Sequence, residues 1–189
     1  ERLGVPGPRA TPTSDGERVY ALGATGVLSA VALDTGKLVW QTNILQDRGM
    51  TNLTYGMSGA PLVIAGKVIV HTSGLNGPGV VAYSATTGTV VWEGPPRQQG
   101  YASVSALSLL GTTHLVNLAG TELVGLDPAT GNELWTFEWD TWNGLSCAQP
   151  LRVNDHQLFV STGYSKGAAL VELTEVDGQI TARAVWTGM

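Results

Sequence analysis

Short apolar runs, rich in Val, Leu, Tyr and Trp, alternate along the chain with polar turns that contain Gly. Runs of four to seven residues with β-branched and aromatic side chains are typical of strands, and no helical period appears. In the first unit the predicted strands occupy 10–13, 18–22, 28–33 and 37–42. The same layout recurs three more times, so the pattern predicts four sheets of four short strands each.

A longer repeat is superimposed on these strands. The segments 30–40 (AVALDTGKLVW), 82–92 (AYSATTGTVVW) and 125–135 (GLDPATGNELW) each begin with a small residue, then have Thr-Gly, then Trp. A fourth copy keeps only Trp186, after Asp177-Gly178. Periods of about 40 to 50 residues are typical of propeller blades and solenoids. We therefore expect an all-β propeller domain over 1–189, with blades at approximately 9–44, 58–94, 102–139 and 147–187.

Two of the invariant residues of the repeat, Gly and Trp, have structural explanations. The Gly of the Thr-Gly pair provides the positive φ that a short hairpin requires between the third and fourth strands. The Trp lies in the outermost strand, and an indole that buries about 150 to 250 Å² is best placed between neighbouring sheets. We expect this docking role for the four repeat tryptophans, Trp40, Trp92, Trp135 and Trp186.

Composition narrows the possible partners. With 43% hydrophobic and 13% charged residues, the chain is apolar enough to fold around a core. The net charge of -5, with only 10 basic residues and no basic run, argues against nucleic acid or an anionic membrane surface as the main partner. No apolar run approaches the roughly 18 to 20 residues that span a bilayer, so no transmembrane segment is expected. The single Cys147 excludes an internal disulfide.

The pattern of small residue, Thr-Gly and Trp resembles the tryptophan-docking motif of the β-propellers named for pyrroloquinoline quinone (PQQ), over nearly the whole chain. Segments such as GMSGAPLV and STGYSKGAALVEL are most similar to the non-catalytic propeller lipoproteins of outer-membrane assembly. The motif usually has Asp two residues after the small residue; Asp127 keeps it, whereas Ala32 and Ser84 replace it. The resemblance implies a scaffold or binding module of the bacterial periplasm or cell envelope.

Family members resemble closed rings of eight blades, and the four repeats correspond to half of one. The chain starts at Glu1 in polar sequence, near an innermost strand, and Trp186 lies in an outermost strand, so we expect a piece of something longer. Open end blades expose apolar sheet faces. We therefore expect a protein partner, or a second copy of the chain, to cover these faces and complete the propeller.

An enzyme of the same fold is the alternative function. A quinoprotein dehydrogenase holds PQQ between flat side chains, with a Ca²⁺ ion and a carboxylate base. The adjacent half-cystines of the familiar enzymes are absent, and Asp140 with Asn143 falls short of the six to eight oxygens that Ca²⁺ takes. The histidines, His71, His114 and His156, show no metal-ligand spacing. We therefore expect no catalytic residues, no metal and no cofactor, with PQQ and Ca²⁺ as the alternative.

Any binding surface is expected in the loops that line one mouth of a propeller. These loops span 45–57, 94–101 and 138–146, together with a turn between the second and third strands of the last repeat. Arg, Tyr and Trp beside amides are favoured at interaction surfaces, although such residues also simply solvate and cap loops. The candidate binding residues are Arg48, Asn52, Tyr55, Arg97, Gln99, Tyr101, Asp140, Trp142, Asn143, Tyr164 and Lys166.

Overall fold

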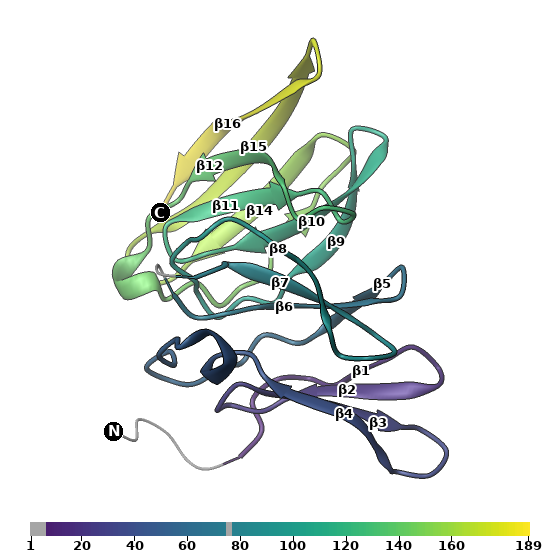
Figure 1. Cartoon of the computed structure of the whole chain (residues 1–189). Helices are drawn as coiled ribbons and strands as arrows, with labels where there is room; N and C mark the ends of the chain where they lie inside the picture. The colour runs from purple at the N-terminus through teal and green to yellow at the C-terminus, as the bar shows by residue number, and fades with distance from the viewer. Residues whose placement is uncertain (1–6, 75–76) are drawn as a thin grey trace. The chain divides into compact units, whose positions relative to one another are not determined.

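The computed structural model describes residues 7–74 and 77–189, and the described chain forms four antiparallel sheets of four strands (Figure 1). The strands are β1 (Thr13–Ser14), β2 (Arg18–Leu22), β3 (Val27–Ala32), β4 (Leu38–Asn43), β5 (Leu62–Ile64), β6 (Lys67–His71), β7 (Val80–Ser84), β8 (Val90–Glu93), β9 (Ser105–Leu109), β10 (Thr112–Leu118), β11 (Glu122–Leu126), β12 (Glu133–Glu138), β13 (Leu151–Arg152), β14 (Gln157–Thr162), β15 (Gly167–Val176) and β16 (Gln179–Gly188). Within each sheet the strands follow chain order. The prediction of an all-β protein with four four-stranded blades is confirmed.

The chain divides into two compact units. The first ends at Arg97 and holds the sheets β1–β4 and β5–β8, and the second begins at Gln98 and holds β9–β12 and β13–β16. Each unit has its own apolar core, which lies between its two sheets. Tyr20 and Tyr83 belong to the core of the first unit, and Leu118 and Leu158 to that of the second.

The innermost strands are shorter than the apolar runs predicted. Strand β1 begins at Thr13, β5 at Leu62 and β13 at Leu151, and the residue before each of them is a proline. Proline has no backbone N–H to donate to a ladder, so it ends the hydrogen-bonded part of the strand. The first apolar residues of these repeats thus lead into the sheet without pairing.

Each outermost strand carries a β-bulge next to its repeat tryptophan. Trp40 pairs with Ala30 and Leu38 with Val31, which leaves Val39 as the extra residue. The register shifts at the corresponding place in the three other sheets. A bulge bends the strand and redirects its side chains. The bulge therefore helps to set the direction in which each indole leaves its sheet.

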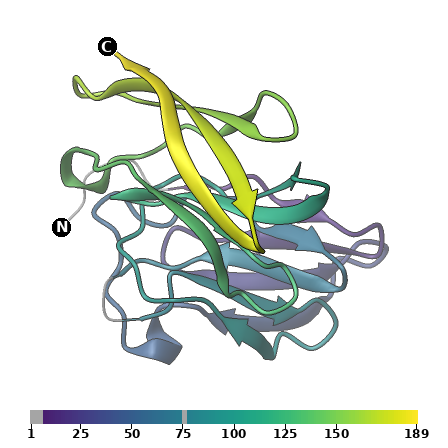
Figure 2. The same cartoon turned by 90° about the horizontal axis from the view of Figure 1, so that it is seen from above.

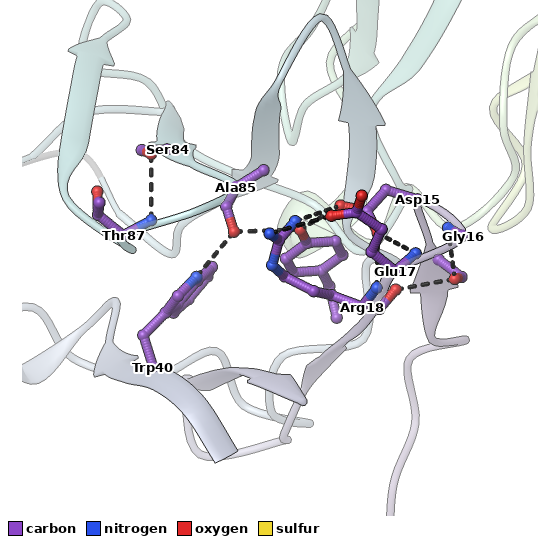
Figure 3. Close-up of polar contacts among 10 residues, drawn as sticks. Asp15, Gly16, Glu17, Arg18, Trp40, Ser84, Ala85 and Thr87 are labelled. Carbon is purple, nitrogen blue, oxygen red and sulfur yellow. Dashed lines mark hydrogen bonds and ion pairs between the residues drawn. The ribbon is translucent and has the colours of Figure 1, made fainter. Parts of the chain in front are cut away.

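In the first unit, Trp40 packs against the hairpin of the following sheet (Figure 3). Its indole Nε1–H donates to the backbone carbonyl oxygen of Ala85 over 2.9 Å. The Tyr20 hydroxyl oxygen lies 3.1 Å from the same carbonyl oxygen. Gly88 lies under the ring, where a Cβ would come within 2.6 Å of Trp40 Cδ2. The Gly of the motif thus has two roles. It allows the φ of 67 to 76° that the three Thr-Gly turns adopt. At position 88 it also leaves the space that the indole occupies.

A small polar network at the β1–β2 turn stands beside this contact. The Asp15 carboxylate accepts hydrogen bonds from the Tyr20 hydroxyl at 2.7 Å and from the Arg18 guanidinium at 3.0 Å. The bond from Tyr20 is the largest cause that lowers the pKa of Asp15 to about 2, assisted by the backbone N–H groups of Glu17 and Arg18. The carboxylate is therefore ionised at neutral pH and holds the tyrosine in place.

Trp135, in the second unit, is held differently. The following hairpin, between β15 and β16, lacks Thr-Gly, and the Trp135 Nε1–H donates instead to His114 Nδ1 over 2.9 Å, within its own sheet. Gly125 makes room for the ring, since a Cβ there would lie 2.2 Å from Trp135 Cε2. The other nitrogen of His114, Nε2, lies 3.0 Å from Thr112 Oγ1. His114 Nδ1 must be unprotonated to accept, so the imidazole is neutral.

The β15–β16 hairpin is longer than the repeat predicts. Strands β15 and β16 pair as far as Val176 and Gln179, whereas β14 pairs with β15 only up to Glu172. The two strands therefore run on as a ribbon beyond the rest of their sheet (Figures 1 and 2). Leu173, Ile180 and Ala182 on this ribbon join the core of the second unit.

We predict that Trp40→Ala lowers the free energy of unfolding by about 3 to 5 kcal/mol, because it removes a large buried side chain and leaves a cavity. The exposed Trp142 provides the matched control, and its change to Ala should cost about 0.5 kcal/mol or less. Urea denaturation followed by circular dichroism measures both. Equal losses would show that Trp40 is not what joins the two sheets of the first unit.

We predict that stability falls as the pH drops below 6.5. Burial lowers the folded-state pKa of His114 and of His71, so the unfolded chain binds more protons below its ordinary value of 6.5. The stabilising contribution is complete above that pH and is lost as the pH falls through the folded pKa. Thermal unfolding between pH 7.5 and 4.5 tests this for the wild type and for His114→Gln, whose amide does not titrate. An equally steep pH dependence in that variant would contradict the role of His114.

Candidate functional site

The candidate binding residues of the first unit are largely engaged in internal contacts. Arg48 follows β4 in a short 3-10 helix, η1 (Gln46–Arg48), and its guanidinium is paired with the Glu93 carboxylate at 2.7 Å. It also donates to the Tyr83 hydroxyl over 2.8 Å, and burial raises the pKa of that tyrosine to about 12. Asn52 donates from Nδ2 to the Ala24 carbonyl oxygen over 2.8 Å. These contacts fix the loop against its sheets.

Three further candidates lie where the two units meet in sequence. Arg97 and Gln99 are buried, and Tyr101 is half-buried with its backbone N–H bonded to the Ser146 carbonyl oxygen at 2.7 Å. Buried side chains do not form an open binding surface, so the structure gives Arg97 and Gln99 an internal position where the sequence suggested an exposed one. Tyr55, in the first unit, is exposed.

The exposed candidates of the second unit come together around two aromatic rings. Trp142 lies on the 3-10 helix η2 (Trp142–Gly144), and Tyr164 lies in the turn between β14 and β15. Their ring centroids are 5.1 Å apart with an interplanar angle of 34°, and the residues are 59% and 64% exposed. Asp140 and Asn143 are exposed beside Trp142 in the chain. We call Asp140, Trp142, Asn143 and Tyr164 the aromatic platform.

Left-handed backbone conformations shape both halves of the aromatic platform. Asn143 has a φ of 52°, Tyr164 of 56° and Ser165 of 61°. Residues other than Gly rarely adopt this region, and a bulky side chain there is strained. The strain is accommodated because both loops are fixed at their ends to the β-sheet framework. Such local strain is more common at functional sites than elsewhere.

A second, buried tryptophan supports the platform. Trp139 donates from Nε1 to Thr162 Oγ1 over 2.9 Å, which ties the loop after β12 to the end of β14. The Lys166 ammonium lies 4.6 Å from the centre of the Trp139 ring, in cation–π contact. Lys166 is thus a support of the platform as well as a candidate contact. The sequence interpretation did not include Trp139, although its place directly after Leu134, Trp135 and Phe137 of β12 was a usable signal.

A hollow of about 440 Å³ adjoins Tyr164. It is lined by Leu145, Cys147, Ala148, Ser161, Thr162, Gly163 and Tyr164. Cys147 is exposed at its edge, and desolvation raises the pKa of its thiol. The thiol form therefore predominates at neutral pH and is a weak nucleophile. The hollow extends the platform as a recess beside Tyr164.

The platform does not match a quinone site. Atoms in van der Waals contact are about 3.5 to 4.0 Å apart, so a flat cofactor between two rings requires roughly 7 Å between them. Trp142 and Tyr164 are 5.1 Å apart and contact each other. Within 7–74 and 77–189 no group of three or more His, Cys, Asp or Glu side chains is arranged to hold a metal ion. Trp142 and Tyr164 therefore do not enclose a flat cofactor between their rings.

The comparison with protein families settles the family. The model described as outer membrane protein assembly factor BamB matches residues 6–187 of the chain. The chain belongs to the BamB family. The resemblance to propellers of the PQQ type, stated from the sequence motif, is confirmed at the level of the family.

Individual relatives agree with this assignment. The outer membrane protein assembly factor BamB of Kangiella koreensis is 28% identical over 162 residues, which cover 85% of this chain and 38% of that protein. The crystal structure of BamB from Moraxella catarrhalis has a TM-score of 0.60 at 14% identity, over 95% of this chain and 48% of that one. The chain thus spans less than half the length of either relative.

An enzyme shares the fold. The quinohemoprotein alcohol dehydrogenase from Comamonas testosteroni has a TM-score of 0.51 at 21% identity, over 83% of this chain and 30% of that one. Similarity at this identity concerns the fold alone, because propellers carry unrelated functions.

Proposed function

We propose that this chain belongs to a non-catalytic propeller scaffold of the bacterial cell envelope and binds a protein partner through the aromatic platform. The observation that carries the proposal is the contact between Trp142 and Tyr164, both more than half exposed and held on fixed loops. Trp and Tyr are enriched among the residues that dominate binding energies, and they lose little conformational entropy on binding. Asp140 and Asn143 would form the polar rim that such interfaces have.

The cell envelope, and the periplasm in particular, is proposed from the family. Its relatives are named for the assembly of outer-membrane proteins, which points to a protein partner from the same compartment. No helix in the described part of the chain is long and apolar enough to span a bilayer. A protein partner, or a second copy of this chain, is also proposed to complete the propeller.

We predict that a crosslinker at Asp140 captures an envelope protein in cells. A photoreactive amino acid would replace Asp140, and mass spectrometry would identify the adduct. In the variant Trp142→Ala with Tyr164→Ala, the adduct should decrease at least tenfold, because the central aromatic contacts of an interface contribute most of its energy. The matched control is Leu38→Ala, which truncates a similarly exposed apolar side chain in the first unit. An adduct that persists in the double variant would contradict binding through the platform.

We predict no oxidation of alcohols or sugars by the protein supplied with PQQ and Ca²⁺. The platform rings are too close to enclose the quinone, and Asp140 with Asn143 provides too few oxygen ligands for Ca²⁺. Dye-linked turnover, measured beside a quinoprotein alcohol dehydrogenase as the positive control, tests this. Turnover above the rate of the free cofactor would favour the dehydrogenase alternative and overturn the non-catalytic assignment.

A further inference from the structure

The charges of the chain are divided unequally between its two units. Residues 1–97 contain six Asp or Glu and seven Lys or Arg, a net charge of +1. Residues 98–189 contain nine Asp or Glu and three Lys or Arg, a net charge of -6. The aromatic platform belongs to the second unit. A cationic partner is therefore attracted to the unit that carries the platform, and an anionic partner is repelled.

The three cations of the second unit leave the two exposed rings of the platform open. Lys166 lies over the buried Trp139, with its ammonium 4.6 Å from the ring centre. Arg152 is paired with Asp155 at 3.6 Å, and Arg183 lies on β16. Within the part of the chain that the structure describes, no cation–π contact reaches the platform rings. The rings therefore remain available to a cation from a partner.

Two carboxylates lie on the same side of the loop as the Trp142 ring. The backbone stays extended after β12, since Thr141, directly before η2, has a φ of -116° and a ψ of 147°. Side chains alternate on extended backbone, and Glu138, Asp140 and Trp142 are exposed, whereas the residues between them are buried. Consecutive exposed positions are roughly 6.5 Å apart along the chain. Within 7–74 and 77–189 neither carboxylate forms an ion pair.

The first unit contains a complete site in which an arginine joins a ring and a carboxylate. The Arg48 guanidinium carbon lies 5.5 Å from the centre of the Tyr83 ring, and Arg48 Nη2 is 2.7 Å from Glu93 Oε1. A guanidinium is planar, so it can lie on a ring while its edge donates to a carboxylate. The platform supplies the rings and the carboxylates of this arrangement without the arginine.

We propose that the aromatic platform binds an arginine side chain from a basic segment of the partner protein. The guanidinium lies on the exposed ring of Trp142 and donates to the Asp140 carboxylate, and Glu138 attracts a further cationic residue of the same segment. Arginine is favoured over lysine because an ammonium has no flat face to stack and no fork of donors. The inference rests on the proposed function and deepens it, since it states which chemistry of the partner the platform recognises.

The test uses three peptides that differ only in their central side chain. Each has two glycines on either side of arginine, lysine or citrulline, which has the planar shape of arginine without its charge. Binding is followed through the indole N–H resonance of Trp142 in isotope-labelled protein, assigned by its loss in Trp142→Phe. The arginine peptide should bind most tightly. Citrulline should raise the dissociation constant about fivefold or more, because exposed cation–π and ion-pair contacts both depend on the charge.

Removal of the carboxylates tests which part of the surface attracts the cation. In Glu138→Gln with Asp140→Asn, the dissociation constant of the arginine peptide should rise about fivefold or more. The matched control is Glu175→Gln with Asp177→Asn, which removes two exposed carboxylates from the far end of the β15–β16 hairpin. The control changes the net charge equally, so a change of about twofold or less is expected from distant, screened charges. Circular dichroism establishes that each variant is folded.

Capture in cells separates this inference from the proposed function. A photoreactive residue at Asn143 leaves both carboxylates in place, and its adduct with an envelope protein should decrease when Glu138 and Asp140 are neutralised. An adduct that the neutralisation leaves unchanged would keep the proposed function and overturn the cationic partner. The absence of any adduct, with the arginine peptide bound as expected, would contradict the proposed function and support the arginine site. Equal binding of the citrulline and arginine peptides, or equal losses in the two double variants, would overturn the inference whatever the cells show.

Discussion

The first unit depends on one buried interaction, the contact of the Trp40 indole with the hairpin of the next sheet. The ring supplies a large apolar surface, and its single N–H has to be satisfied once water is excluded. The Ala85 carbonyl oxygen meets that requirement, and Gly88 leaves the necessary space. The Thr-Gly turn is therefore both the end of one sheet and the binding site for its neighbour, which explains why the two features of the repeat occur together.

In the second unit, different residues hold the tryptophan indole in place. His114 accepts the hydrogen bond from Trp135, and Gly125 allows the ring to lie on its own sheet. The loss of Thr-Gly in the last repeat is thereby tolerated, and the hairpin there is free to lengthen into the β15–β16 ribbon. The histidine introduces a pH-sensitive group into a position where the first unit uses a backbone carbonyl, which has no protonation equilibrium in this range.

The sequence predicted the sheets well because strands and Thr-Gly turns are local features. It predicted the candidate site less well, because burial depends on which segments meet. Arg48 and Gln99 read as surface residues, yet the first is held by Glu93 and Tyr83, far away in sequence, and the second is enclosed. Trp142 and Tyr164 were both candidate binding residues from the sequence. Their contact, however, depends on residues with positive φ in two loops, and the sequence pattern did not predict these conformations.

The hydrogen bonds of Trp135 and Trp40 also differ in when they can form while the chain is synthesised on the ribosome. Trp135 finds its acceptor 21 residues earlier in the chain, so the bond forms from segments that have already left the ribosome. The acceptor of Trp40 lies 45 residues later in the chain, so this hydrogen bond forms only after the second sheet has been synthesised. Loop closure costs more as the separation grows, and domains fold from the N-terminus during translation. Of these two tryptophans, Trp40 is consequently the one that stays exposed longer in a growing chain.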